Sequence, residues 1–257
     1  MAQRKTLRSD LAWATPDRIF VKGYDLCEDL LGRLSLGDMA FLEMMDRRPT
    51  AEESNVFNAM ALTLVEHGLT PSAIATRMTL AGAPEAMQAA VAAGLCGLGS
   101  VFVGSMEAAA RVLQQALPSS QASCDIDMQA REIVTTHIAE KRTISGIGHH
   151  FHKPADPRAQ KLFDIARANG LSGRYVALMQ SIAREAEKQL GKSLPVNATG
   201  AIAALASELG MPWNIVRGVG VISRAIGLVG HIREELKNPL AREIKTRAEE
   251  EASSHRR

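Results

Sequence analysis

The side chains best suited to chemistry are concentrated between Gly146 and Ala159. Glycines let the backbone approach a ligand closely, and imidazoles can donate a hydrogen bond to a carbonyl or carry a proton near neutral pH. The planar guanidinium of Arg158, which follows a rigid proline, suits a carboxylate. The pattern predicts a binding site for a polyanionic carbonyl compound. The full stretch is Gly146-Ile147-Gly148-His149-His150-Phe151-His152-Lys153-Pro154-Ala155-Asp156-Pro157-Arg158-Ala159.

Two histidines of this stretch, His150 and His152, also suggest a metal site at first sight. Divalent metal sites usually need three or four ligands. The neighbouring sequence offers no carboxylate or cysteine pattern that would complete such a set. We therefore expect no metal ion.

The overall composition argues against large charged partners. The formal net charge of the 257 residues is only +2, and aromatic residues make up 4%. Neither a strong field for nucleic acid or lipid nor a set of base-stacking side chains is expected. The three cysteines, Cys27, Cys96 and Cys124, are too widely spaced for a disulfide or metal framework. We expect small-molecule substrates, no nucleic-acid or membrane partner, and a cytoplasmic protein.

Residues 86–106 form an uncharged segment that is long enough to cross a membrane. Its four glycines and many alanines make it only weakly hydrophobic, and small residues of this kind let helices pack closely. We expect two buried helices, separated near Gly97 to Gly99, rather than a membrane span. A single chain of this size has difficulty burying such a segment completely, which predicts a homodimer or a dimer of dimers.

Apolar residues recur at helical spacing along almost the whole chain, so the fold is expected to be all-α. Ser35 is a candidate N-cap, and Pro49-Thr50 begins another helix with acidic residues in its first turn. The only fair candidate for a strand is the segment 21–24. Further helices are expected after Pro71 and Pro84, and over residues 127–141, 159–168, 173–190, 201–209 and 213–235.

Several motifs, in the same order along the chain, resemble the citrate synthase superfamily. Its signature is a Gly-x-Gly-His turn followed by Asp-Pro-Arg, which this chain carries at residues 146–149 and 156–158. The late Ser-Arg-x-x-Gly helix of the family is similar to residues 223–227, and Gly230-His231 follows it. The resemblance covers roughly residues 18–242, with further matching segments at 20–26, 47–50, 66–68 and 98–108.

The resemblance implies an all-α, citrate-synthase-like fold with two helical domains. The large domain, residues 1–107 and 209–257, is expected to contain the core and the dimer interface. The small domain, residues 108–208, is expected to carry the turn that binds CoA and carboxylates. The active site would lie in the cleft between them, where domain closure excludes water.

The resemblance also implies formation or cleavage of a carbon–carbon bond between an acyl-CoA enolate and a keto acid. His149 is expected to hydrogen-bond the oxygen at that bond, an electrostatic effect that is often the largest in catalysis. His67 would add a further catalytic donor that also binds substrate. Arginines would hold the carboxylates in bidentate fashion: Arg158, Arg224 and, reaching across the dimer, Arg242.

Coenzyme A is the only cofactor that the resemblance implies, as part of the acyl-CoA substrate or product. The backbone around Ile147, Gly148 and His150 is expected to meet the adenine, as the glycine turn of the family does. Lysines near this turn and near residues 194–197 are candidates for the CoA phosphates, although lysines at helix ends are usually only solvated. These are Lys153, Lys188 and Lys192.

Two positions depart from the synthases of the family. Synthases have a histidine for the thioester oxygen where this chain has Phe102, and the pattern around Phe102 resembles the citryl-CoA lyase type. That type includes stand-alone lyases and the lyase module of ATP-citrate lyase. In addition, Thr199 stands where the family has its catalytic aspartate. A threonine hydroxyl is not ionised near neutral pH and cannot be a general base, so Thr199 is expected to donate a hydrogen bond or to orient a water molecule.

Three functions therefore remain open. The first is a lyase that cleaves a citryl-CoA-like 3-hydroxy-3-carboxyacyl-CoA into an acyl-CoA, such as acetyl-CoA, and a 2-keto acid, such as oxaloacetate. The second is a non-catalytic homologue that binds CoA and carboxylates. The third is a condensing enzyme with altered acid–base residues, which Phe102 and Thr199 together make the least favoured enzyme.

Overall fold

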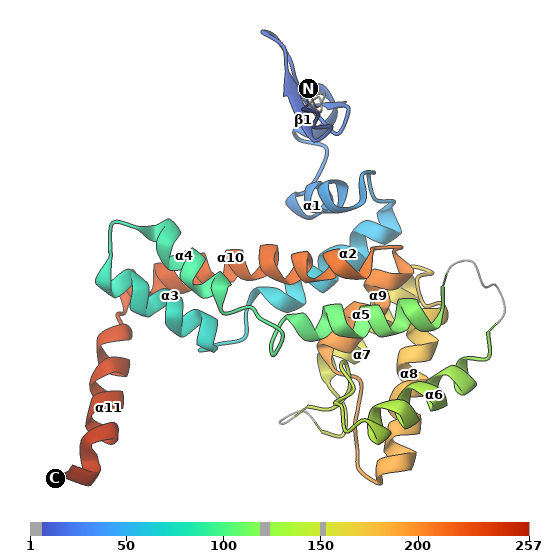
Figure 1. Ribbon diagram of the computed structural model, residues 1–257. Coiled ribbons are helices and arrows are strands. Elements are labelled where there is room, and N and C mark those ends of the chain that lie inside the picture. The colour runs from blue at the N-terminus through green and yellow to red at the C-terminus, as the bar shows by residue number, and fades with distance from the viewer. Residues whose placement is uncertain (1–6, 119–123, 150–152, 257) are drawn as a thin grey trace, which may run out of the picture.

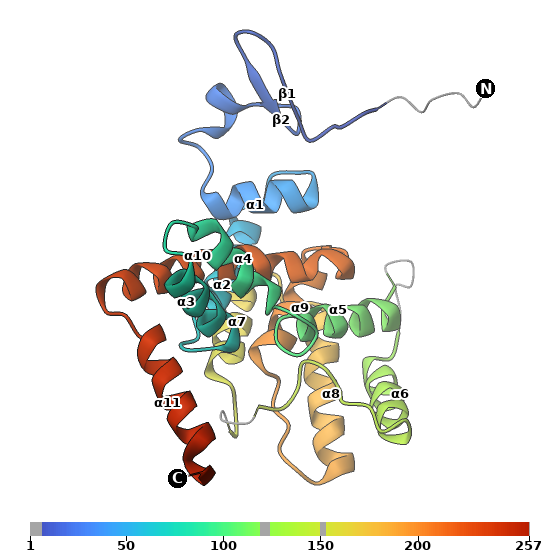
Figure 2. The same cartoon turned by 60° about the vertical axis from the view of Figure 1, so that its left-hand side comes forward.

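The computed structural model describes residues 7–118, 124–149 and 153–256. They form a helical body from which a small sheet projects at the N-terminal end (Figures 1 and 2). The prediction of an all-α fold is confirmed apart from this sheet. The α-helices of the described residues are α1 (Leu36–Met45), α2 (Ala51–Val65), α3 (Pro71–Gly82), α4 (Met87–Cys96), α5 (Gly104–Ala116), α6 (Ile126–Ala139), α7 (Pro157–Ala168), α8 (Arg174–Leu190), α9 (Ala198–Glu208), α10 (Val216–Lys237) and α11 (Ala241–Ser253).

The N-terminal sheet corrects one sequence expectation. The segment 21–24 is not a single strand, because Lys22 and Gly23 have φ angles of 50° and 86° and turn the chain back on itself. Trp13 stacks on Phe20 of the neighbouring strand, with ring centroids 5.2 Å apart. The sheet consists of three short antiparallel strands, β1 (Ala12–Ala14), β2 (Ile19–Val21) and β3 (Tyr24–Asp25), and a π-helical turn follows at Leu26–Leu30.

Side-chain caps begin the first two helices. The Ser35 hydroxyl accepts the Asp38 N–H while the Asp38 carboxylate accepts the Ser35 N–H. Thr50 and Glu53 make the same reciprocal pair at the start of α2. Each pair satisfies backbone donors that a helix otherwise leaves open at its N-terminus. The predicted N-cap at Ser35 and the predicted helix start near Thr50 are confirmed.

Helices α2, α3, α4 and α10 pack together in one half of the molecule (Figure 1). Helix α4 approaches α3 closely at Gly94, where an added β-carbon would lie 2.1 Å from Thr76 Oγ1. The predicted break in the uncharged segment is confirmed, because α4 ends at Cys96 and α5 begins at Gly104. Within this chain α4 buries Ala90 and Gly94 but exposes much of its other face, in line with the expectation that a single chain does not bury the segment completely.

Helix α9 is the centre of the other half, where α5, α7 and α8 pack against it (Figure 2). Almost all of its residues are buried. The largest cluster of buried side chains joins this half to α2, because it includes both Met60 of α2 and Leu205 of α9. The division into a domain of residues 108–208 and a domain of the remaining residues stays a prediction.

Within the described part of the chain, one helical segment, Trp213–Lys237, is long and apolar enough to cross a membrane by length and composition alone. Half of its apolar window is buried inside the structure. It packs against α2, α3 and α4, and it carries the buried polar residues Arg224 and His231. This segment, which contains α10, is therefore a core helix of the fold.

Candidate active site

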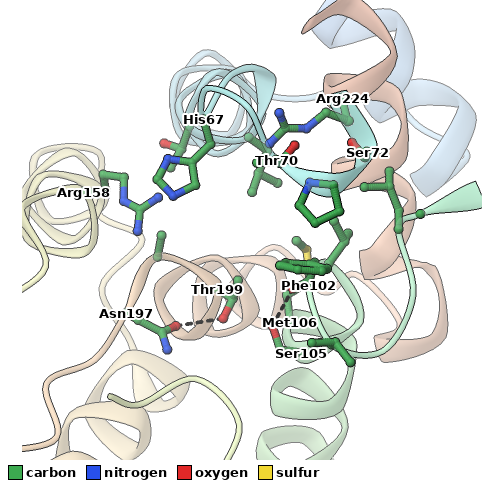
Figure 3. Close-up of a pocket in the computed structure, with 18 of the residues that line it drawn as sticks. His67, Thr70, Ser72, Phe102, Ser105, Met106, Arg158, Asn197, Thr199 and Arg224 are labelled. Carbon is green, nitrogen blue, oxygen red and sulfur yellow. Dashed lines mark hydrogen bonds between the residues drawn. The ribbon is translucent and has the colours of Figure 1, made fainter. Parts of the chain in front are cut away.

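A cavity of about 350 Å³ opens between the C-terminal end of α2, the loop before α5 and the first turn of α9. It brings together five sequence-predicted residues, His67, His149, Arg158, Thr199 and Arg224, from distant parts of the chain. Figure 3 shows His67, Arg158, Thr199 and Arg224 around one common space. The rest of the lining comes from Thr63, Leu64, Thr70, Pro71, Ser72, Gly97, Leu98, Val101, Phe102, Val103, Ser105, Met106, Asn197 and Ala198.

The glycine turn that carries His149 is held against the segment that precedes α9. Gly146 and Gly148 have φ angles of 95° and 78°, in the left-handed region that favours glycine. The Gly148 N–H donates to the Pro195 carbonyl at 2.7 Å, and the Asn197 N–H donates to the Gly146 carbonyl at 3.0 Å. These backbone contacts explain how two separate segments of the sequence meet at the cavity.

Thr199 lies in the first turn of α9, which approaches the glycine turn closely. A β-carbon on Gly200 would lie 2.1 Å from the Gly146 carbonyl oxygen, so this approach requires glycine. The Thr199 hydroxyl donates to Asn197 Oδ1 at 2.7 Å, and the same oxygen caps α9 by accepting the Gly200 N–H at 3.0 Å. The hydroxyl hydrogen of Thr199 is therefore engaged, while its oxygen can still accept a hydrogen bond from a ligand or water.

Arg158 is held by a buried carboxylate, that of Asp156. Arg158 Nε donates to Oδ1 at 3.0 Å and Nη2 donates to Oδ2 at 2.9 Å, a bidentate geometry. Asp156 also accepts the backbone N–H groups of Arg158 and Ala198, each at 3.0 Å. Burial raises the pKa of Asp156, but these hydrogen bonds outweigh burial and place the pKa below its ordinary value. Ionised Asp156 thus ties α7 to α9 and orients Arg158, whose Nη2 lies 3.4 Å from His149 Nε2.

Arg224 enters the cavity from α10 and is only 8% exposed. Its Nη1 atom is buried and has no hydrogen-bond partner among the described residues. The Glu66 carboxylate oxygen Oε1 lies 3.9 Å from this atom, beyond hydrogen-bond distance. Burial lowers the pKa of Arg224, while Glu66 acts in the opposite sense. A buried N–H without a partner is unfavourable, so a ligand carboxylate at this position would be strongly held.

His67 follows the C-terminal end of α2, and the side chain of Glu66 fixes its backbone. Glu66 Oε1 accepts the N–H groups of His67 and Gly68 at 2.8 and 2.7 Å. Burial raises the pKa of Glu66, but these bonds and one from His231 outweigh burial, so the pKa lies below its ordinary value. An ionised Glu66 therefore holds the turn from which the His67 ring points towards Arg158 (Figure 3).

One wall of the cavity is apolar. Leu98, Val101, Phe102 and Met106 contribute to it, and the Phe102 ring has no group that can hydrogen-bond a thioester oxygen. Among the described residues that line the cavity, none is an aspartate or a glutamate. The cavity therefore offers cationic and hydroxyl groups for an oxyanion beside an apolar surface, without a carboxylate base.

The other sequence-predicted residues that the structure describes do not line the cavity. Ile147 and Gly148 are partly buried in the adjacent glycine turn, and His150 lies outside the described residues. Arg242 is exposed at the start of α11, so its role across a dimer stays a prediction. The three lysines expected near the CoA phosphates are exposed, and that role also stays a prediction: Lys153, Lys188 and Lys192.

No role was predicted from the sequence for Asp156, Ser72 or Asn197, which the structure places at the site. Asp156 had a detectable signal, because an aspartate directly before a proline is typical of a helix N-cap. Ser72 had none. Its hydroxyl is buried without a hydrogen-bond partner in the described part of the chain, which makes it a further candidate contact for a ligand. No cluster of three or more metal-ligating side chains occurs within residues 7–118, 124–149 and 153–256.

Comparison with known proteins decides the family. Residues 36–247 match the family model for the citrate synthase C-terminal domain. The chain belongs to the citrate synthase family. The matched region includes all five sequence-predicted residues of the cavity, so the family assignment and the site geometry concern the same part of the chain.

Solved structures of the family confirm the predicted fold and the resemblance to the lyase type. Citryl-CoA lyase from Hydrogenobacter thermophilus is similar over 91% of this chain and 88% of that chain, with 34% identity and a TM-score of 0.83. ATP citrate lyase from Methanosaeta concilii, in complex with (3S)-citryl-CoA, is also similar. The similarity extends over 92% of this chain but over only 40% of the ATP citrate lyase chain. Its identity is 20% and its TM-score 0.76, a likeness that shows the fold alone.

Curated relatives are more distant and longer. A probable ATP-citrate synthase from Dictyostelium discoideum is 24% identical over 241 residues, which is 86% of this chain and 37% of that protein. This chain spans about half or less of the length of the curated relatives that it matches. Activities of those whole proteins therefore do not transfer directly to this chain.

Proposed function

We propose that this protein is a carbon–carbon lyase of the citryl-CoA lyase type. Its substrate is a citryl-CoA-like 3-hydroxy-3-carboxyacyl-CoA, and its products are an acyl-CoA, such as acetyl-CoA, and a 2-keto acid, such as oxaloacetate. One observation carries the proposal. His149, Arg158 and Arg224 converge on a cavity without a carboxylate base, in a chain that is similar to a citryl-CoA lyase over most of its length.

Cleavage begins with removal of the proton from the tertiary hydroxyl group of the substrate. Arg158 Nη2 lies 3.4 Å from His149 Nε2, and because a guanidinium can only donate, this imidazole nitrogen is the unprotonated one. It can accept the hydroxyl proton once the substrate replaces this long contact. As the carbonyl of the keto acid forms, the carbon–carbon bond breaks and its electron pair moves into the thioester as an enolate. Arg158 and Arg224 hold the carboxylates of the keto acid half, and His67 adds a donor.

The enolate then takes a proton from water or a histidine, and the acyl-CoA leaves. Thr199 orients that water by accepting a hydrogen bond from it, because the hydroxyl hydrogen of Thr199 is already donated to Asn197. Water can protonate an enolate without a strong acid, whereas removal of a proton from acetyl-CoA needs a base. The described residues therefore supply groups for breaking the carbon–carbon bond but no carboxylate for the proton removal that begins condensation.

The test is turnover of citryl-CoA by the purified full-length protein. Acetyl-CoA and oxaloacetate should appear in equal amounts, and His149→Ala should abolish their release while CoA binding persists. His255→Ala, at an exposed position near the end of the chain, is the matched control and should retain full activity. If no tricarboxylic acyl-CoA releases a keto acid, the lyase proposal loses its main support.

A second candidate is a non-catalytic homologue that binds CoA and carboxylates. It is favoured by the same observation that no aspartate or glutamate lines the described cavity. Such a protein would show ligand-induced stabilisation by CoA and citrate with no turnover. A condensing enzyme is the least favoured, because Phe102 and Thr199 replace both groups that would generate and hold an enolate.

We further propose a homodimer, or a dimer of dimers, in the cytoplasm. Helix α10 exposes Ile222, Ile226 and Val229 along one side, and a continuous apolar face on a soluble protein is typical of an interface. The three cysteines are unpaired, as is usual in a reducing compartment. Light scattering at micromolar concentration should report an even number of chains. A monomer would contradict the proposal and would leave Arg242 without a role at the site.

A further inference from the structure

Outside the cavity lining, α3 and α10 bury a set of ionisable side chains. Arg77 is 0% exposed, and His231 and Glu235 are 7% and 6% exposed. Arg77 Nη1 donates to Glu235 Oε2 at 2.8 Å, and Arg77 also pairs with Glu234. Charged groups are buried only when they are paired, because their loss of hydration is unfavourable. None of these four described residues lines the cavity, so their arrangement calls for an explanation other than direct contact with a ligand.

The contacts of His231 determine which of its ring nitrogens carries the hydrogen. Arg77 Nε and Nη2 lie 3.2 and 2.8 Å from His231 Nδ1. A guanidinium has donors only, so Nδ1 must be the acceptor and the ring hydrogen must be on Nε2. His231 Nε2 lies 3.1 Å from Glu66 Oε1. The hydrogen bonds therefore run in one direction, from Arg77 through His231 to Glu66.

The oxygen that accepts this bond, Glu66 Oε1, also contacts the backbone of one cavity residue and lies near the side chain of another. Glu66 Oε1 also accepts the backbone N–H groups of His67 and Gly68, at 2.8 and 2.7 Å. The same oxygen lies 3.9 Å from Arg224 Nη1. His67 and Arg224 both line the cavity, and Glu66 is their shared neighbour. A change in the position of Glu66 would therefore move one ligand-binding group and alter the charge beside the other.

The helical register of α10 supports this arrangement. Arg224, Gly227 and His231 are three and four residues apart, so they lie on one face of the helix. A β-carbon on Gly227 would lie 1.9 Å from the Val65 carbonyl oxygen and 3.2 Å from Glu66 Oε2. Glycine at this position lets α10 lie against the end of α2, with Arg224 and His231 both close to Glu66 Oε1.

We propose that His231 is a positioning residue of the carboxylate-binding site. Together with Arg77 it holds the Glu66 carboxylate, and Glu66 in turn fixes the backbone of His67 and the charge next to Arg224. The proposal rests on the proposed function only in that the cavity binds carboxylates, and it does not require turnover.

Two substitutions separate the two hydrogen bonds of the ring. A glutamine amide extends about as far as Nε2, so His231→Gln keeps a donor for Glu66 but loses the acceptor for Arg77. An asparagine amide extends only to the position of Nδ1, so His231→Asn keeps the acceptor for Arg77 but loses the donor for Glu66. Each variant is the matched control for the other, and neither changes a residue that lines the cavity.

The measurement is calorimetric binding of oxaloacetate and, separately, of CoA to the full-length protein. We expect His231→Asn to weaken oxaloacetate binding roughly tenfold and to leave CoA binding within about twofold, the scale of one lost hydrogen bond to a charged group. His231→Gln should bind oxaloacetate within about threefold of wild type. NMR of the histidine ring nitrogens should place the hydrogen of the wild-type His231 ring on Nε2.

Equal oxaloacetate affinities in wild type and His231→Asn would overturn the proposal. The reverse order, with His231→Gln impaired and His231→Asn intact, would also overturn it, because His231 would then serve Arg77 alone. If only the lyase proposal is wrong, the outcome differs. Oxaloacetate then binds, the two variants keep the expected order of oxaloacetate affinity, and citryl-CoA is not cleaved. A wild-type protein that binds no carboxylate would refute both proposals.

Discussion

Replacing Asp156 with asparagine should disturb two helices through a change of very small volume. Four N–H donors converge on the two carboxylate oxygens: the Arg158 N–H and Nε on Oδ1, and Arg158 Nη2 and the Ala198 N–H on Oδ2. An asparagine side chain has one acceptor and one NH₂ group. In either orientation of the amide, the NH₂ group would face two donors. No rotation can therefore restore the contacts.

The expected magnitude follows from the burial of the pair. A hydrogen bond to a charged group contributes about 1.5–3 kcal/mol, and breaking a buried ion pair costs about 3–5 kcal/mol. The Asp156 side chain is 0% exposed, but Arg158 is 29% exposed and can regain water on its open side. The lower part of these ranges therefore applies. We expect a loss of ~2–4 kcal/mol in the free energy of unfolding, on the order of 10 °C in melting temperature for a chain of this size.

The pH dependence has a definite sign. The pKa of Asp156 in the folded protein lies below its ordinary value of 3.8. A carboxyl group of this kind contributes stability above its unfolded-state pKa, and the contribution is lost as the pH falls through the folded-state pKa. The difference in melting temperature between wild type and Asp156→Asn should therefore be complete at neutral pH and should shrink below about pH 4.

Thermal unfolding followed by circular dichroism, together with citrate binding, provides the assay. Asp164→Asn is the matched control on the same helix, because Asp164 forms an exposed ion pair with Arg167 at 3.0 Å. Exposed pairs contribute about 0–1 kcal/mol, so this control should melt close to wild type. Only Asp156→Asn should also weaken citrate binding, since Asp156 orients Arg158. The reasoning would be refuted if Asp156→Asn had the same melting temperature as the wild type. It would also be refuted if the difference in melting temperature did not change with pH.

Three further predictions test separate parts of the site. Arg158→Ala should weaken citrate binding about 10- to 150-fold and leave CoA binding nearly unchanged, whereas Arg167→Ala should change neither; equal losses for both ligands would indicate a folding defect. Thr199→Ala should reduce citryl-CoA cleavage only modestly, while Thr199→Asp should allow deuterium exchange at the acetyl-CoA methyl group, measured by NMR. Rapid exchange by the wild-type protein would contradict this, because none of the described residues that line the cavity is a carboxylate that could remove the methyl proton. Gly227→Ala should cost about 1–3 kcal/mol in denaturant unfolding, because the new β-carbon would meet a backbone carbonyl at 1.9 Å. Gly230→Ala, with nothing within 4 Å, should be neutral or stabilising by about 0.5–1 kcal/mol.

Most helices could be predicted because their signals are local. The caps at Ser35 and Thr50 and the proline at the start of α7 lie within a few residues of the helix that each begins. The N-terminal sheet was missed because its first strand, Ala12–Ala14, depends on pairing with Ile19–Val21. The exposed face of α4 agrees with the expectation that a single chain does not bury the uncharged segment completely, but residue composition alone does not say which side of the helix is covered.

The site could be predicted where its residues are adjacent in sequence or occur in an ordered family motif. His149 and Arg158 belong to one short stretch, and the structure places both at the cavity. The contacts that orient them could not be predicted, because they join distant residues. Asp156 meets the backbone of Ala198, 42 residues away, and Glu66 meets His231, 165 residues away. Such pairs leave no periodic trace in a single sequence.

Thr199 is better explained as part of an organised site than as the mere loss of the catalytic aspartate of the family. Its hydroxyl is donated to Asn197, which also caps α9 and donates to the Gly148 carbonyl at 2.8 Å. One amide therefore links Thr199 to the turn that carries His149. General acid–base catalysis typically contributes about 10²- to 10⁴-fold, and a condensing enzyme without its aspartate would lose that factor in forming the enolate. Cleavage forms the enolate by breaking a carbon–carbon bond and then has to protonate it, a step in which water can take the place of the aspartate.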